Sequence, residues 1–195
     1  MPRRCCRQSI RIMAISFVLL LALPSVVSAA EVVDAGANGF TVKISVDIGG
    51  TPSEVFRQIL NIGDWWNPDH TYSGDAHNLS LEDRVGGCLC EKLPNQGGVR
   101  HMEVIFVAPG KTLRLAGALG PLQALGASGT LSFGLSPSST GTKLDVTYAV
   151  SGYVAHGMNA FASPVDATLS DQINRLKNYV ETGSPTTAQA RPKSQ

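Results

Sequence analysis

Two side chains with the spacing of a proton-transfer pair, His101 and Glu103, stand in one strand-like stretch of the sequence. Residues two apart on a strand point to the same face, and a histidine beside a carboxylate is the arrangement that general acid–base catalysis needs. Met102, Val104 and Phe106 alternate with them and compete for the inner face. The pair therefore has two interpretations: an acid–base pair turned inward, or a polar pair in solvent.

Tyr148 and two adjacent tryptophans are further candidates. Tyr148 alternates with apolar residues on its strand, and a buried tyrosine hydroxyl needs a hydrogen-bond partner, which a ligand cavity can supply. Trp65 and Trp66 follow an expected helix, and neighbouring residues on a helix cannot both face the same core. Either one of them lines the mouth of a cavity, or one is core and the other covers a loop at the surface.

Ligand sites are commonly apolar cavities that contain a few polar groups. The inward residues of the expected strands and of the last helix are therefore candidates for such a wall. Plain core packing is the alternative for each of them. The predicted ligand-binding residues are Trp65, Trp66, Leu113, Leu115, Leu131, Phe133, Val146, Tyr148, Val150, Leu169 and Ile173.

Cys88 and Cys90 share one face of an expected strand, and their Cα atoms lie near the upper limit for a disulfide. We interpret them as two small buried strand residues; a redox pair is the alternative. Five side chains carry donor atoms that could bind a metal such as zinc or copper, but none has a recognised ligand spacing. We therefore predict no metal and no cofactor. The five side chains are His70, His77, His101, Cys88 and Cys90.

Residues 1–30 have the pattern of a secretory signal peptide. Four arginines precede the apolar run 12–23, and small residues follow it at 28–30. The run is about a dozen residues long, short of the roughly twenty that a permanent span needs, although an uncleaved anchor is the alternative. We expect an exported protein, periplasmic or secreted, with no stable membrane span after cleavage. A single domain at 31–183 and a disordered polar tail at 184–195 should remain.

Charge and motifs exclude several functions. Without residues 1–30, twelve basic residues face fifteen acidic ones, and no Lys/Arg cluster occurs, so a nucleic-acid partner is not expected. The sequence has no Gly-x-Ser-x-Gly elbow, phosphate loop or dinucleotide fingerprint. A nucleophilic or nucleotide-dependent enzyme therefore has no support.

The periodicity predicts an α+β fold. Apolar residues at helical spacing predict a closing helix over 163–180, with Ser163 as N-cap, while Thr51-Pro52-Ser53-Glu54 predicts a capping box that starts a helix. Period-two patterns predict strands at 40–48, 79–81, 87–93, 99–107, 112–119, 129–135 and 142–153. We expect a curved antiparallel sheet of about seven strands wrapped around the long C-terminal helix, with short helices after the first strand.

Six short motifs occur in a fixed order along this pattern. They are Thr51-Pro-Ser-Glu-Val-Phe56, Trp65-Trp66, Arg84-Val-Gly-Gly87, Ala108-Pro-Gly-Lys-Thr-Leu-Arg-Leu115, Gly141-Thr-Lys-Leu144 and Gly152-Tyr153. Together they resemble the SRPBCC superfamily, also called START-like or helix-grip, in its branch of polyketide-cyclase-like and heat-shock ATPase-activator-like proteins. The resemblance implies an apolar cavity between sheet and closing helix that holds lipids, hormones or polyketides. The Cys88-Leu-Cys90 pair is not part of that pattern.

Three functional hypotheses remain. The first is an exported binder or carrier of a small hydrophobic, lipid-like or polyketide-like ligand. The second is an enzyme of cyclase or dehydratase type in the same cavity, with His101, Glu103 or Tyr148 as acid–base groups. The third is a domain that binds a protein partner through an exposed sheet face or the Trp65–Trp66 corner. The oligomeric state stays open.

Overall fold

One continuous antiparallel sheet organises the chain. The computed structural model describes residues 29–186, and within that range the sheet has eight strands in the order β1-β2-β8-β7-β6-β5-β4-β3. Their bounds are β1 (Ala29–Gly36), β2 (Gly39–Ile48), β3 (Leu79–Leu81), β4 (Cys88–Lys92), β5 (Gly98–Ala108), β6 (Thr112–Gly117), β7 (Ser128–Ser138) and β8 (Gly141–Ser151). β2 pairs with β8, so residues about a hundred positions apart lie side by side.

The α+β class is confirmed, but the sheet has eight strands and not seven. The additional strand is β1, which pairs with β2 along one edge of the sheet. Its sequence does not alternate cleanly, and its pairing slips between Val32 and Asp34, so periodicity did not reveal it. Residues 29 and 30 of the predicted signal peptide belong to this strand. The rest of that peptide, and the predicted tail from residue 187 on, lie outside the described residues.

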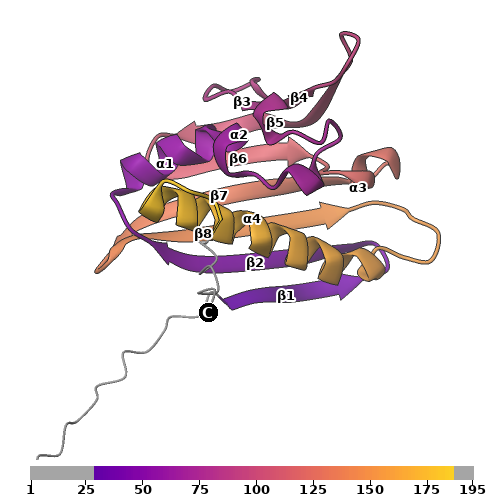
Figure 1. Ribbon diagram of the computed structural model, residues 1–195. Coiled ribbons are helices and arrows are strands. Elements are labelled where there is room, and N and C mark those ends of the chain that lie inside the picture. Colours follow the sequence, from indigo (N-terminus) through magenta and orange to yellow (C-terminus); the bar gives the residue numbers. More distant parts are fainter. Residues whose placement is uncertain (1–28, 187–195) are drawn as a thin grey trace, which may run out of the picture.

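Short helices follow β2, as the capping motif predicts. α1 (Pro52–Leu60) begins with the expected capping box: the Glu54 amide donates to Thr51 Oγ1, and the Thr51 amide donates to the Glu54 carboxylate. α2 (Ile62–Trp65) continues the chain after Asn61. Two 3₁₀ turns, η1 (Pro68–His70) and η2 (Ala76–Asn78), then lead into β3. This segment crosses the face of the sheet on which the closing helix also lies (Figure 1).

The closing helix α4 (Ala162–Thr182) spans the predicted range and extends past it at both ends. Ser163 is not its N-cap. A 3₁₀ turn, η3 (Asn159–Phe161), runs directly into the helix and leaves Phe161 at the cap position without a side-chain hydrogen bond. Gly183 ends the helix in the left-handed conformation, at φ 76°. Leu169, Ile173 and Leu176 are buried against the sheet, and α4 lies across one of its faces (Figure 1).

Between β6 and β7 the chain forms one more short helix, α3 (Pro121–Ala124). It stands at the same end of the molecule as the start of α4 (Figure 1). No helix within residues 29–186 is both long enough and apolar enough to cross a bilayer.

Candidate functional site

A cavity of about 400 Å³ lies between the sheet and the N-terminal half of α4. Its inner wall is made of buried apolar side chains, among them Leu89 of β4, Leu122 of α3 and Leu169 of α4. Its mouth is formed by exposed residues from three segments, including His70, Pro121 and Pro164. The full lining is Ile62, Trp66, Asp69, His70, Thr71, Tyr72, Leu79, Leu89, His101, Leu119, Gly120, Pro121, Leu122, Tyr148, Phe161, Pro164, Val165, Thr168 and Leu169.

One side of the mouth is the segment 67–75, here called the mouth loop. α4 fixes its first residue: the Asn67 amide donates to Gln172 Oε1 at 2.7 Å, and Asn67 Nδ2 donates to Asp171 Oδ2 at 2.8 Å. Gln172 is fully buried, so its hydrogen bond is made away from water, where losing it is costly. The mouth loop is therefore held at its N-terminal end by the helix that forms the opposite wall.

The other end of the mouth loop is held by Glu91 of β4. The Glu91 side chain is buried, at 2% exposure, and its Oε1 accepts the amide of Ser73 at 2.5 Å. Its Oε2 lies 3.0 Å from Nε2 of His101, which is 7% exposed and lines the cavity. Tyr72 stacks on the His101 ring, with centroids 5.8 Å apart and planes inclined by 17°. One carboxylate thus joins the mouth loop to the histidine in the cavity wall.

The hydrogen bonds also define the charge of this pair. Burial raises the pKa of Glu91, but the hydrogen bonds from Ser73, from the Tyr72 amide and from His101 outweigh it, so the pKa lies below its ordinary value. Glu91 is therefore a carboxylate near neutral pH and can only accept hydrogen bonds. It follows that Nε2 of His101 carries a proton. Nδ1 receives no hydrogen bond from any described residue, which leaves it available to a ligand.

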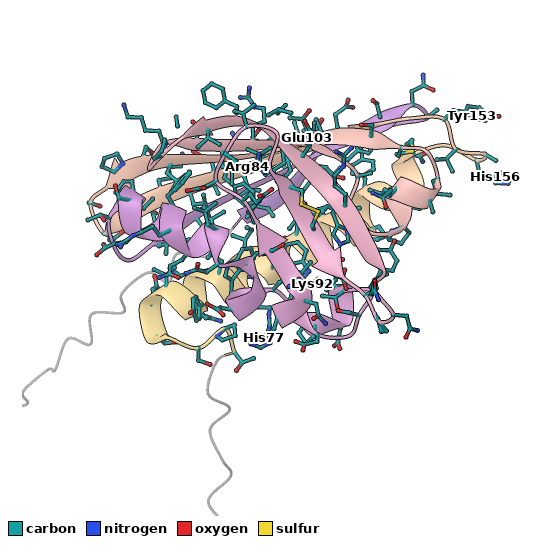
Figure 2. The ribbon with its side chains drawn as sticks, turned by 90° about the horizontal axis from the view of Figure 1, so that it is seen from above. His77, Arg84, Lys92, Glu103, Tyr153 and His156 are labelled. Atoms are coloured by element: carbon teal, nitrogen blue, oxygen red, sulfur yellow. A yellow bond between two sulfur atoms is a disulfide. The ribbon has the colours of Figure 1, made fainter. Side chains whose placement is uncertain are left out.

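His101 and Glu103 do not share a face, contrary to the expectation from their spacing. A bulge in β5 is the reason: Met102 pairs with Leu89 and Arg100 with Cys90, so His101 has no partner on β4. The extra residue turns both His101 and Met102 inward. Glu103 lies on the side of the sheet opposite α4, where it pairs with Arg100 in solvent (Figure 2). Glu103 is therefore not part of the site.

Tyr148 of β8 closes the inner end of the cavity. It is fully buried, and its hydroxyl oxygen accepts the Leu119 amide at 3.1 Å. Burial raises the pKa of Tyr148 to about 12, so the hydroxyl stays protonated at any ordinary pH. Within residues 29–186, no acceptor receives its O–H. The hydroxyl is thus a hydrogen-bond donor in a largely apolar cavity wall.

Comparisons with known proteins identify the fold. No family model and no curated protein matches the sequence. Solved structures do match. The protein MLL2253 from Mesorhizobium loti has a TM-score of 0.54 at 20% identity, over 72% of this chain and 96% of that one. CalU16 from Micromonospora echinospora has a TM-score of 0.54 at 12% identity, over 82% of this chain and 86% of that one.

DynU16, a protein in the dynemicin biosynthetic locus, also has a TM-score of 0.54, at 19% identity. The match covers 74% of this chain and 48% of DynU16. At these identities the likeness concerns the fold alone.

The structure brings three of the predicted ligand-binding residues to the cavity, namely Trp66, Tyr148 and Leu169. Trp65 is instead fully buried in the core, where its Nε1 donates to the Gln58 carbonyl at 2.7 Å. The other predicted residues pack in the same core without lining this cavity. They are Leu113, Leu115, Leu131, Phe133, Val146, Val150 and Ile173. The tryptophans form no exposed corner for a partner, since both are buried.

Glu91, which holds His101 in place, was not predicted from the sequence, and neither were most of the apolar lining residues. A signal existed, because Leu89 and Glu91 stand two apart on a short strand and share a face. A carboxylate next to an inward leucine is buried only when it is paired. The partner, His101, comes from a neighbouring strand ten residues away, and its direction depends on the bulge.

Cys88 and Cys90 lie on β4 as predicted, but they are half-buried and joined by a disulfide, so the interpretation as two small buried strand residues is wrong. Their Cα atoms are 5.4 Å apart, closer than the roughly 6.6 Å that two extended residues span. The strand is contracted between them, which brings the sulfur atoms within bonding distance. Among the described residues, no group of three or more His, Cys, Asp or Glu side chains is placed to hold a metal ion.

Proposed function

We propose that the protein is an exported binder or carrier of a small, largely apolar molecule with one polar group. The observation that carries this is the cavity itself: about 400 Å³, apolar along most of its wall, with His101 and Tyr148 in its lining. This volume lies within the range of small-molecule sites. Placement in the SRPBCC superfamily, and a lipid-like or polyketide-like ligand, belong to the same proposal. The motif order and the fold it shares with solved structures support it.

The polar groups specify what the ligand must offer. Tyr148 supplies a donor, and Nδ1 of His101 supplies an acceptor while the imidazole is neutral. A ligand hydroxyl matches either group, because it can accept a hydrogen bond from Tyr148 or donate one to His101. The apolar remainder of the ligand is stabilised by burial at about 25 cal/mol per Å², before the cost of association.

Filling the cavity tests this proposal. Thr168 of α4 lines it and is half-buried, so Thr168→Trp should occupy the space with an indole and raise the Kd for 2-naphthol at least about tenfold. Fluorescence titration measures the affinity. Ala167→Trp is the matched control, because Ala167 is the preceding residue of the same helix and is exposed.

Ala167→Trp should bind the probe as the wild type does, and both variants should keep the wild-type melting temperature within a few degrees. Equal binding by wild type and Thr168→Trp would show that the probe does not enter the cavity. Native mass spectrometry of protein from its own exported fraction then tests the natural ligand, where a reproducible small apolar adduct is expected.

The Glu91–His101 pair favours a second candidate function, an acid–base enzyme of cyclase or dehydratase type in the same cavity. A carboxylate that fixes one ring nitrogen leaves the other as a general base, and Tyr148 can donate to an oxygen that gains charge. Proton exchange at the α-carbon of 2-tetralone in D₂O, followed by NMR, measures this directly. The base removes the C–H proton to give the enolate, and a deuteron returns to the same carbon.

Catalysed exchange should be about 10²-fold slower in His101→Gln than in the wild type. Glu103→Gln is the control, because that side chain lies outside the cavity, and it should exchange at the wild-type rate. Wild-type exchange no faster than that of imidazole at equal concentration would leave the binder as the function of this site.

A further inference from the structure

The disulfide lies on the strand that carries Leu89, which lines the cavity, and Glu91, which holds the cavity residue His101. Leu89 and Glu91 are buried on one side of β4, and Cys88 and Cys90 alternate with them on the other side of the strand. The bridge therefore spans Leu89, which lines the cavity, and directly precedes Glu91, which holds both His101 and Ser73. The disulfide is the yellow bond between two sulfur atoms in Figure 2. Neither cysteine lines the cavity.

β4 is contracted between its two cysteines at the same place where β5 has the bulge that turns His101 inward. The pairing of β4 with β5 shifts between Leu89 and Cys90, and the unpaired residue opposite this step is His101. A regular ladder needs extended spacing on both strands, whereas β4 is shortened to 5.4 Å between the two cysteine Cα atoms. The bridge and the unpaired residue of β5 therefore lie at the same step of the β4–β5 pair.

We propose that the Cys88–Cys90 disulfide is a positioning element for the candidate site: by keeping β4 contracted, it holds Glu91 against His101 and the mouth loop. Without the bridge, β4 can extend toward regular spacing, His101 can enter the ladder, and Glu91 moves along the strand axis away from Nε2 and the Ser73 amide. The part of this proposal that concerns ligand affinity rests on the proposed binding function. The part that concerns Glu91 and His101 does not.

The test compares bridged and unbridged protein by ¹H–¹⁵N NMR. Dithiothreitol reduces the disulfide to two thiols and is itself oxidised to a cyclic disulfide. The Ser73 amide should lose the downfield shift of a hydrogen bond to a carboxylate, and the Nε2 and Nδ1 resonances of His101 should move. The Kd for 2-naphthol should rise at least about fivefold. Cys88→Val/Cys90→Val gives an unbridged chain with strand-favouring residues and should reproduce the reduced spectrum.

Thr51→Ala is the matched control for lost stability alone. It removes the cap of α1, which lowers the stability of the fold, and should leave the Ser73 and His101 resonances unchanged. If the unbridged protein is folded and keeps these resonances at the wild-type positions, the proposal is overturned. If the resonances move but neither form binds 2-naphthol, the disulfide is a positioning element and the binding function fails. An unchanged Kd with moved resonances overturns the link to affinity.

Discussion

Glu91→Ala should lower the free energy of unfolding by about 2–6 kcal/mol at neutral pH, because leaving a buried hydrogen-bond donor without its acceptor costs about 1–3 kcal/mol and Glu91 serves two donors. The substitution leaves the half-buried Ser73 amide and the buried Nε2 of His101 without their acceptor. Urea unfolding measures the change. Glu103→Ala is the matched control, since it removes a carboxylate that pairs with Arg100 in solvent, and it should cost less than about 1 kcal/mol.

Glu91→Gln separates the charge of this residue from its hydrogen bonds. The pKa of Glu91 is lowered in the folded protein, so the stability that its charge provides is complete above the unfolded pKa of about 4.5 and is lost as the pH falls through the folded pKa. The difference in unfolding free energy between wild type and Glu91→Gln should be largest near neutral pH. It should become smaller as the pH falls below about 4.5. A gap that is constant down to about pH 3 would contradict this assignment.

Trp65→Ala should also cost about 3–5 kcal/mol, because it empties the space of a fully buried indole. The Trp65 carbonyl also accepts a hydrogen bond from Arg175 of α4 at 2.9 Å. The substitution therefore weakens the packing between α2 and the closing helix. Thermal unfolding measures the effect. Trp65→Phe keeps most of the ring volume and loses the hydrogen bond to Gln58, so it should cost only about 1–3 kcal/mol.

Trp66→Ala is the informative comparison. Trp66 lines the cavity, so its removal widens a space that is already open. The Kd for 2-naphthol should therefore rise, while the free energy of unfolding should fall less than in Trp65→Ala. Equal losses of stability for Trp65→Ala and Trp66→Ala would contradict the division of the two residues into core and cavity wall.

Local patterns predicted most of the elements. The capping box at Thr51 and the helical spacing from residue 163 onward place α1 and α4, and alternation places the strands from β2 to β8. These signals were readable because hydrogen bonds and burial there follow the period of a single element. β1 was not predicted, because its residues do not alternate cleanly and its hydrogen-bond partners lie on β2.

The site followed a different logic. His101, Tyr148 and Trp66 were candidates by residue type. Their positions in the sequence, however, do not show which core residues border a cavity and which are surrounded by other side chains. Phe133 and Tyr148 both alternate inward on neighbouring strands, yet only Tyr148 reaches the space beside α4 and the mouth loop. That difference is set by the distance between layers, which no single strand encodes.

By itself, the sequence determined the class of fold, the closing helix and the residue types available for chemistry, because each depends on neighbours a few positions away. The tertiary structure alone decided that His101 faces inward, that Glu91 is its partner and that Glu103 is not. Those outcomes depend on one unpaired residue between two strands, opposite a disulfide. A bulge of one residue reverses which side chains face the core, and this reversal appears only when both strands of the pair are in view.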